Sequence, residues 1–369
     1  MSPHRIPFMS LVPGEDAADV RRAIERVVAS GWFVLGPEVA AFEREFAAAS
    51  GATRAVGVGN GTDAIALILR ALGIGAGDEV ITSPLSAAYS ALAIIMAGAR
   101  PVFADVDPLT ATLDPERIAE RVGPRTRAIL PVHLYGQPAD MTGIARVAAR
   151  HDLAIVEDCC QAHLATSEGR PVGTIGAAGA FSFYPTKNLG ALGDGGAVVT
   201  NDGALADRVA RLRSGGQTDR YHHQEPGINS RLDEIQAAIL RARLPHLPEW
   251  TARRRALAAR YRTGLADSPI DVPPELDAGH VYHLFVVRTA ARRELQAHLA
   301  ERGIETLIHY PVSLPRQPAM ASADPADCPV AVRACDEILS LPLHPAMHDD
   351  SVDEVAAAVH AFEPRSVAS

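Results

Sequence analysis

The chain has 369 residues, of which 47% are hydrophobic and 21% are charged, and its formal net charge is -9 at pH 7. An acidic chain without a basic stripe argues against a nucleic-acid or anionic-membrane surface. The length exceeds a single compact core, so we expect two domains. We interpret the three consecutive arginines at 253–255 as one solvated helix face.

Targeting and redox signals are weak. The N-terminal stretch has no apolar core of signal-peptide length, and no uncharged run reaches the ~18 apolar residues of a membrane helix. Cys159 and Cys160 are adjacent, while Cys328 and Cys335 lie far along the chain. This spacing fits neither a zinc site nor a disulfide framework, so we expect no metal and a cytoplasmic protein with reduced thiols.

The first elements in the chain are two helices. Apolar residues at helical spacing begin at Val20 and stop at Gly31, and a second helix opens at Pro37 and ends near Gly51. The segment between them, GWFVLG at 31–36, is apolar and flanked by glycines. It is either a packing turn or a loop over a pocket.

From Arg54 the pattern alternates between short apolar strands and helices. We expect strands at 55–60, 79–82, 101–104, 128–132, 153–157, 180–184 and 197–200, with helices between them and at 205–212 and 232–244. This pattern predicts an α/β fold with a mostly parallel sheet covered on both faces.

A boundary is expected at Pro245 and Pro248. We therefore predict a large α/β domain at 1–245 and a small C-terminal α+β domain at 246–369. The small domain would hold a long helix with the arginines, strands at 281–288 and 305–309, and helices at 292–301, 330–339 and 352–362.

Lys187 stands in a glycine-rich loop after the predicted strand at 180–184. It has no acidic neighbour for six residues on either side. Loops at strand ends often carry catalytic side chains. Small residues around the lysine leave room for a flat ligand, which suggests a Schiff-base lysine, although an ordinary solvated lysine has the same local pattern.

Two further signals lie upstream. Gly61 and Thr62 open an amphipathic helix, where free backbone N–H groups favour an anion, although the segment matches neither a dinucleotide fingerprint nor a P-loop. Asp158 ends a short apolar strand, at the edge where open parallel sheets bind ligands. A lysine for an aldehyde, an aspartate for a ring nitrogen and a helix N-terminus for a phosphate are what pyridoxal phosphate needs.

The chain also resembles, nearly end to end, the DegT/DnrJ/StrS-type sugar aminotransferases, which are pyridoxal-phosphate-dependent enzymes of fold type I. The matching stretches are GWFVLGPEVAAFEREFA, GNGTDAIAL, PVHLYGQPADM, IVEDCCQAH, FSFYPTKNLGALGDGGAVVT, GINSRLDEIQAAIL and IHYPVSLPRQPAM. These motifs are collinear with those of the family. The resemblance implies a large pyridoxal-phosphate domain and a small C-terminal domain.

The resemblance also assigns roles. It implies that Lys187 forms the Schiff base and Asp158 pairs with the pyridine nitrogen. Gln161 would lie on the 3-hydroxyl side of the cofactor. The phosphate would be bound by Gly61, Thr62 and Ser182, and by Asn229 of a neighbouring subunit, so the active sites would be shared across a homodimer.

The implied reaction is amino transfer, usually from glutamate, to a keto-sugar carried on a nucleotide. The wording of the motifs is most similar to that of members acting on dTDP-linked 3-keto-6-deoxyhexoses. The candidates for lining the sugar pocket are Trp32, His133, Tyr135, Tyr221, His283, His309 and Tyr310.

One departure concerns the ring face of the cofactor. The family usually places an aromatic or histidine ring where this chain has Ala87 and Ala88, so either Tyr89 stacks on the cofactor or a small aliphatic group covers it. Loss of a stack costs on the order of 1 kcal/mol. Leu164 also stands where the family usually has glycine.

Several alternatives stay open. The acceptor could be a 4-keto nucleotide sugar or a cyclitol or keto-sugar without a nucleotide. A sugar dehydratase of the family would have histidine in place of Lys187. A non-catalytic regulator could keep the fold, but Lys187, Asp158 and Gln161 favour an enzyme, and no basic pair of DNA-binding helices is evident.

Overall fold

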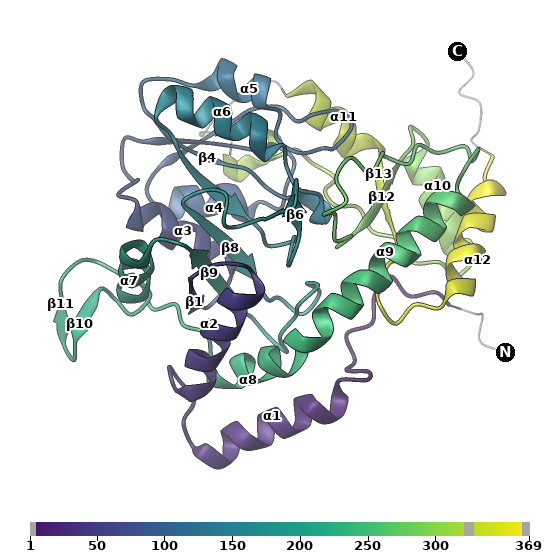
Figure 1. Ribbon diagram of the computed structural model, residues 1–369. Coiled ribbons are helices and arrows are strands. Elements are labelled where there is room, and N and C mark those ends of the chain that lie inside the picture. The colour runs from purple at the N-terminus through teal and green to yellow at the C-terminus, as the bar shows by residue number, and fades with distance from the viewer. Residues whose placement is uncertain (1–4, 321–327, 364–369) are drawn as a thin grey trace.

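A computed structural model describes residues 5–320 and 328–363 of the chain. Its centre is a seven-stranded sheet (Figure 1). The strands are, in spatial order, β1 (Arg54–Val58), β9 (Gly196–Thr200), β8 (Ala178–Ser182), β5 (Ala154–Asp158), β4 (Thr126–Leu130), β2 (Glu79–Thr82) and β3 (Arg100–Phe103). The pairs from β8 to β3 are parallel, while β9 is antiparallel to both its neighbours. The predicted α/β fold with a mostly parallel sheet is confirmed.

Helices cover both faces of this sheet because each strand sends successive side chains to opposite faces. Val80 packs in the cluster beneath one layer of helices, and the next residue, Ile81, packs in the cluster beneath the other. Each buried side chain of this size contributes about 2 kcal/mol. One layer contains α3 (Gly61–Ala71), α4 (Tyr89–Met96) and α7 (Gly203–Leu212); the other contains α2 (Pro37–Ala49), α5 (Pro115–Arg121), α6 (Met141–His151) and α8 (Glu234–Arg243).

The N-terminal helices follow the predicted boundaries. Helix α1 (Ala17–Ser30) ends at Gly31, whose φ of 66° is the left-handed conformation that glycine adopts without strain. Helix α2 begins at Pro37. Between them, the turn at 31–36 is tied to α8, because the Glu234 carboxylate accepts hydrogen bonds from the N–H groups of Gly36, Glu38 and Val39.

The C-terminal part has its own apolar cluster, built from Ile6 and from residues after Leu257. Its elements are α9 (Leu247–Gly264), β12 (Phe285–Arg288), α10 (Arg292–Glu301), α11 (Pro329–Glu337), β13 (Ile338–Leu341) and α12 (Asp349–His360). Figure 1 shows α9 running from the large body to this part. The domain boundary at residue 245 stays a prediction, and the ends of the two predicted domains, 1–4 and 364–369, lie outside the described residues.

Two strand predictions in this part are wrong. The strand expected at 281–288 is only β12, because the chain bends before it and Tyr282 has a φ of 46°. The segment expected as a strand at 305–309 forms only an isolated bridge, between Leu307 and Ser340. The strand that pairs with β12 is instead β13, which lies within and just beyond the helix predicted at 330–339.

The interpretation of residues 253–255 as one solvated face is also wrong. Successive helical residues point about 100° apart, so three in a row cannot share a face. Arg254 is buried and donates to the carbonyls of Tyr282, His283 and Leu343. It joins the middle of α9 to the chain around β12 and β13.

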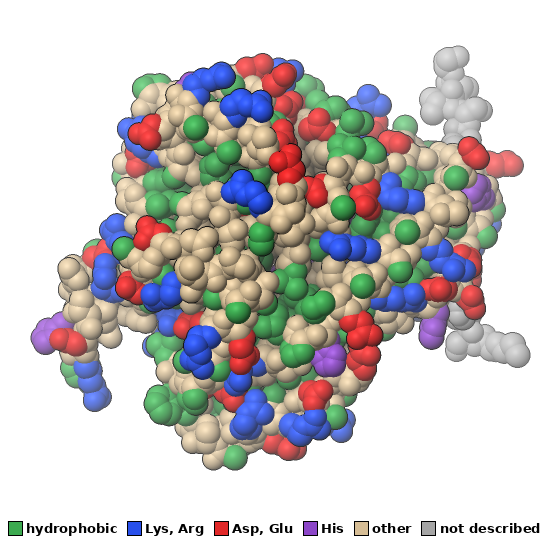
Figure 2. Space-filling model, viewed as in Figure 1, with side chains coloured by type: hydrophobic (Ala, Val, Ile, Leu, Met, Phe, Trp, Pro, Cys, Tyr) green, Lys and Arg blue, Asp and Glu red, His purple; other side chains and the backbone are tan. Residues whose placement is uncertain are grey.

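The remaining elements are short. They are β6 (Thr166–Ser167), β7 (Arg170–Pro171), β10 (Gln217–Asp219), β11 (His222–His223) and the 3-10 helices η1 (Leu134–Gly136), η2 (Leu244–His246), η3 (Leu314–Arg316) and η4 (Pro318–Met320). The β10–β11 hairpin projects from the body (Figures 1 and 2). Charged side chains of both signs are interspersed over the face in Figure 2. Within the described residues, none of the helices combines the length and apolarity needed to cross a membrane.

Candidate active site

The carboxyl ends of β5 and β8 and the start of α3 meet at one edge of the sheet. A Cβ added to Gly61 would lie 2.6 Å from Cys160 Sγ and 2.9 Å from the Cβ of Ser182. Glycine is therefore required at position 61 for the helix to approach the two strand ends. Open parallel sheets bind ligands at this edge.

The first turn of α3 is arranged for an anion. The side chain of Asn60 caps the helix by accepting from the N–H of Asp63 at 2.8 Å, and the Asn60 carbonyl accepts from Ala64 N–H. The preceding N–H groups, those of Gly61 and Thr62, belong to the part of a helix that has no intrahelical acceptors. Together with the helix dipole they form a site for a phosphate, and Ser182 lies beside them.

Asp158 is held rigidly at the end of β5. Only 5% of its surface is exposed. One carboxylate oxygen accepts from the N–H of Cys160 at 3.1 Å and the other from the hydroxyl of Ser90 at 2.7 Å. These donors fix the carboxylate and leave lone pairs for a ligand, since each oxygen can accept more than one hydrogen bond.

Lys187 lies in the loop after β8, and its N–H donates to the carbonyl of Tyr184 at 2.8 Å. Burial lowers the pKa of its amine, while the nearby Cys160 and Asp158 act in the opposite direction. A lysine with a lowered pKa has more of the neutral, nucleophilic amine. Of the 35 lysines and arginines in the sequence, Lys187 is the only lysine.

Gln161, Tyr135 and Tyr310 form a connected group beside Asp158. The Gln161 side chain accepts from the N–H of Tyr135 at 2.7 Å and donates to the Tyr310 hydroxyl at 3.0 Å. The Tyr135 hydroxyl donates to the carbonyl of His309. Burial raises the pKa of Tyr310 to about 12, so its hydroxyl keeps its proton at neutral pH. The structure thus brings the predicted cofactor residue Gln161 to three predicted sugar residues.

The charge of Lys187 affects the pKa of two predicted sugar-pocket histidines, His283 and His309. His283 hydrogen bonds through Nδ1 to the side chain of Asn188 at 3.1 Å, and His309 Nδ1 lies 2.9 Å from the Ser340 hydroxyl. Burial, followed by the charge of Lys187, lowers the pKa of both rings, for His309 to about 4. Both are therefore neutral hydrogen-bonding groups at neutral pH.

Three other predicted residues are not brought to this edge within one chain. Tyr221 is 76% exposed at the tip of the β10–β11 hairpin, and Trp32 is 56% exposed in the turn at 31–36. Asn229 is exposed, and its backbone forms an isolated antiparallel β-bridge with Ser214. Their assigned roles stay predictions.

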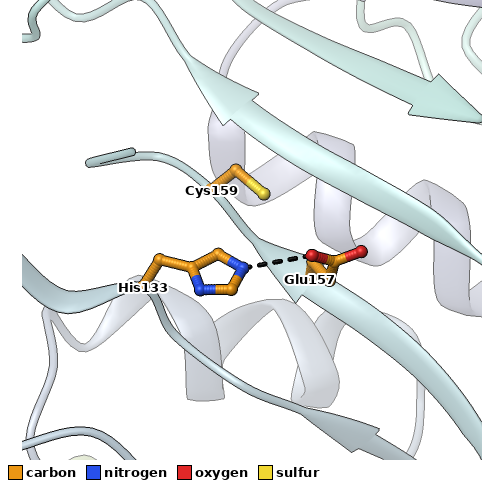
Figure 3. Close-up of side chains that lie close together, drawn as sticks. All are labelled: His133, Glu157 and Cys159. Atoms are coloured by element: carbon orange, nitrogen blue, oxygen red, sulfur yellow. Dashed lines mark hydrogen bonds and ion pairs between the residues drawn. The ribbon is translucent and has the colours of Figure 1, made fainter. Parts of the chain in front are cut away.

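His133 lies behind the edge rather than in it. Its Nε2 is 3.2 Å from the Glu157 carboxylate (Figure 3). Its Nδ1 accepts from Ala139 N–H at 3.1 Å. Cys159 completes a group in which three potential metal-binding atoms lie within 4.8 Å of one another. However, Glu157 also accepts from three backbone N–H groups, those of Gly173, Ile175 and Gly176, and burial raises the pKa of the Cys159 thiol. This cluster holds the 173–176 loop and offers no free ligand set.

The predicted departure near α4 is visible in the structure. Ala87 and Ala88 are half-buried, and Tyr89 opens α4 with 64% of its surface exposed. Whether Tyr89 stacks on a cofactor stays a prediction. Ser90 and Cys160 were not predicted as site residues, because no local pattern marks them. His163 was missed as well; its Nε2–H donates to the Ser182 carbonyl at 2.9 Å.

This donor set fits pyridoxal phosphate. The Lys187 amine, the Asp158 carboxylate and the first amides of α3 lie at the same sheet edge. Position 61 has no room for a residue larger than glycine. Such an arrangement at the edge of this sheet defines the class of pyridoxal-phosphate-dependent enzymes of fold type I.

The particular family follows from comparison with known proteins. The model of the DegT/DnrJ/EryC1/StrS aminotransferase family matches residues 15–360. The chain belongs to this family and is an aminotransferase whose cofactor is pyridoxal phosphate. The recognition made from the sequence is confirmed.

Relatives are similar over nearly their whole length. The chain is 48% identical over 367 residues to dTDP-3-amino-3,4,6-trideoxy-alpha-D-glucose transaminase of Streptomyces venezuelae, covering 98% of this chain and 97% of the relative. It is 45% identical over 360 residues to dTDP-3-amino-3,6-dideoxy-alpha-D-galactopyranose transaminase of Aneurinibacillus thermoaerophilus, covering 97% and 99%. A crystal structure of S. venezuelae DesV superposes with a TM-score of 0.94 at 49% identity, covering 97% of this chain and 98% of that one.

Proposed function

We propose that this enzyme moves an amino group from glutamate to a nucleotide-linked keto-sugar, with a dTDP-linked 3-keto-6-deoxyhexose as its acceptor. The observation that carries the proposal is that Lys187 lies near Asp158 at one sheet edge, beside the group formed by Gln161 and Tyr310. The names of the two relatives support the 3-keto position and the dTDP carrier.

The residues divide the work. When bound, pyridoxal phosphate supplies an aldehyde and an electron sink that let an amino group be taken from one substrate and given to another. Asp158 would pair with its ring nitrogen, and the first amides of α3 with Ser182 would hold its phosphate. The Lys187 amine would attach the aldehyde and, once released, carry a proton to and from the substrate carbon that bears nitrogen.

Neutral hydrogen-bonding groups would orient the sugar. The side chains of His283, His309 and Tyr310 are uncharged at neutral pH. Burial lowers the pKa of the two histidines and raises the pKa of the tyrosine. Such groups suit sugar hydroxyls better than a phosphate. A 4-keto nucleotide sugar or a free cyclitol would use the same groups, so both serve as competing acceptors in the test below.

We further propose a homodimer with shared sites, in the cytoplasm. Four free cysteines fit a reducing compartment. In one chain Trp32 and Tyr221 are exposed, together with the neighbouring Phe33 and Val34, and a second copy would cover them. Asn229 and Tyr221 would then enter the partner's site.

Mixing inactive variants tests the shared site. Lys187→Ala and Asn229→Ala chains would each be poorly active alone. After mixed refolding, a hybrid dimer would contain one site with both native residues, so activity would return to about a quarter of wild type. No recovery, with hybrid dimers shown to form, would contradict the shared site.

The donor and acceptor are tested separately. Glutamate added to the yellow holoenzyme should bleach its visible band, and mass spectrometry should then detect an amino-sugar after addition of a dTDP-3-keto-6-deoxyhexose. The corresponding 4-keto sugar and a keto-cyclitol are the matched competitors. Bleaching without any aminated product from the 3-keto sugar would overturn the proposed acceptor.

A further inference from the structure

Two buried serines stand behind Asp158. Ser90, in the first turn of α4, is 2% exposed, and its hydroxyl lies 2.7 Å from Asp158 Oδ2. Ser86 is 4% exposed, and its hydroxyl lies 3.1 Å from that of Ser90. The three side chains form a continuous line from the start of α4 to the end of β5.

The direction of the hydrogen bonds follows from the chemistry of the groups. An ionised carboxylate can only accept, so the single hydroxyl proton of Ser90 points to Asp158. The hydroxyl of Ser90 can then only accept from Ser86, whose proton points to Ser90. Each bond polarises the next, and hydrogen bonds to a charged acceptor are roughly twice as strong as neutral ones.

We propose that Ser86 and Ser90 are positioning residues that hold the Asp158 carboxylate in the orientation in which it accepts a hydrogen bond from the proton-bearing ring nitrogen of the bound cofactor. The inference rests on the proposed function and adds to it. A carboxylate held in line with the ring nitrogen accepts a charge-assisted hydrogen bond from it, which favours the proton on the nitrogen. The protonated ring is the better electron sink.

The residues between the serines make this contribution more important here. Ala87 and Ala88 cannot stack on an aromatic ring, and Tyr89 is mostly exposed. The two hydroxyl groups of this segment are therefore its buried contacts with the Asp158 side of the site. The hydrogen bonds from Ser86 to Ser90 and from Ser90 to Asp158 would hold the cofactor ring at its nitrogen edge.

The test uses pyridoxal phosphate labelled with 15N in the ring, added to the full-length apoprotein. The wild type should give the 15N chemical shift of a protonated ring. Ser90→Ala should move that shift toward the unprotonated value and raise the dissociation constant of the cofactor roughly tenfold. Ser86→Ala keeps the donor to Asp158, so it should move both quantities in the same direction by a smaller amount.

Two controls separate positioning from packing. Ser83→Ala removes a hydroxyl that is equally buried but bonds only within its own turn, to Leu85; it should leave the shift unchanged. Ser90→Thr retains the hydroxyl and should restore the wild-type shift. In an Asp158→Asn background, Ser90→Ala should have no further effect on the shift.

The outcomes distinguish the two proposals. A wild-type protein that binds no cofactor would overturn the proposed function and this inference together. A protonated ring in the wild type that remains fully protonated in folded Ser90→Ala would overturn the inference alone. Equal changes in the Ser83→Ala and Ser90→Ala proteins would also overturn it, because both would then report general packing.

Discussion

The sheet edge around Asp158 and the two projections around Trp32 and Tyr221 differ in how far a single chain completes them. At the edge, two buried polar side chains are tied to named partners: Asp158 to Ser90 and Cys160, and Gln161 to Tyr135 and Tyr310. On the projections, large apolar side chains are open to solvent. The sheet edge is therefore packed within the single chain, whereas the exposed apolar side chains of the projections have most of their surface free to contact another molecule.

This difference predicts where substitutions act. Changes at the edge should alter the reaction or the stability of the single chain, because buried polar groups lose partners that water cannot replace. Changes on the projections should leave stability almost unchanged and act on assembly and substrate binding. The following experiments test that division, beginning with the largest effect.

Replacing Lys187 should have the largest effect. Lys187→Ala removes the only side-chain amine, and we expect turnover to fall at least roughly a thousandfold. Lys187→Arg is the matched control for charge, because a guanidinium does not form the bond to an aldehyde; it should be equally inactive. Product formation is followed by mass spectrometry, and circular dichroism checks the fold. Near-wild-type turnover of either variant would refute the mechanism.

The second experiment concerns Glu234, which ties the turn at 31–36 and the start of α2 to α8. Glu234 is 1% exposed and accepts three backbone N–H groups at the start of α2. Glu234→Ala should lower the free energy of unfolding by about 3 kcal/mol, because these donors would be left without acceptors. Glu234→Gln, which keeps one acceptor oxygen, should lose less. Urea unfolding measures both, and equal stability of all three proteins would show that the turn is held by other contacts.

The third prediction concerns pH. Burial is the main cause that lowers the pKa of His163 to about 3 from its ordinary value of 6.5. Below pH 6.5 the unfolded chain takes up this proton and the folded chain does not, so stability falls as the pH falls. Each such histidine contributes a slope of up to about 1.4 kcal/mol per pH unit between pH 6.5 and 3.

His163→Gln should reduce this slope by that amount, since glutamine can still donate to the Ser182 carbonyl but does not titrate. The free energy of unfolding, measured at pH 7.5, 6 and 5, gives the slope for both proteins. Identical slopes would mean that His163 does not stay neutral when buried.

The smallest effect on stability is expected at Tyr221. Because 76% of its surface is exposed, Tyr221→Ala should change the free energy of unfolding by less than about 0.5 kcal/mol. If the hairpin enters a partner's site, the same variant should still raise the KM for the sugar. A loss of stability without any change in KM would show that Tyr221 packs within its own chain and does not contact the substrate site of a partner.

The sequence predicted the parts of the fold and site that depend on local patterns. Gly31 and Pro37 marked helix ends by their backbone preferences; Asp158 stood at the end of an apolar strand, and Lys187 stood in the loop after one. Contacts between distant segments left no such mark. The pairing of β12 with β13 joins Phe285 to Leu341, 341 − 285 = 56 positions apart, and the bond from Ser90 to Asp158 spans 158 − 90 = 68 positions.

The arginines at 253–255 also show that local sequence patterns do not predict contacts between distant segments. Composition made residues 253–255 look solvated, but long side chains can donate to buried carbonyl groups as well as to water. Arg254 does so at three carbonyls. Only the position of the helix against β12 and β13 decides between these outcomes.

The single lysine has a consequence for chemical labelling. Pyridoxal phosphate is an aldehyde and condenses with ε-amines on the surface of most proteins, so reductive trapping usually marks several sites. Here the sequence offers no ε-amine other than that of Lys187. Trapping with a hydride reagent should therefore attach one cofactor to one side chain per polypeptide, and amine-directed reagents should compete with the cofactor for that one position. Labelling of the lysine side chain would therefore report on the cofactor site alone.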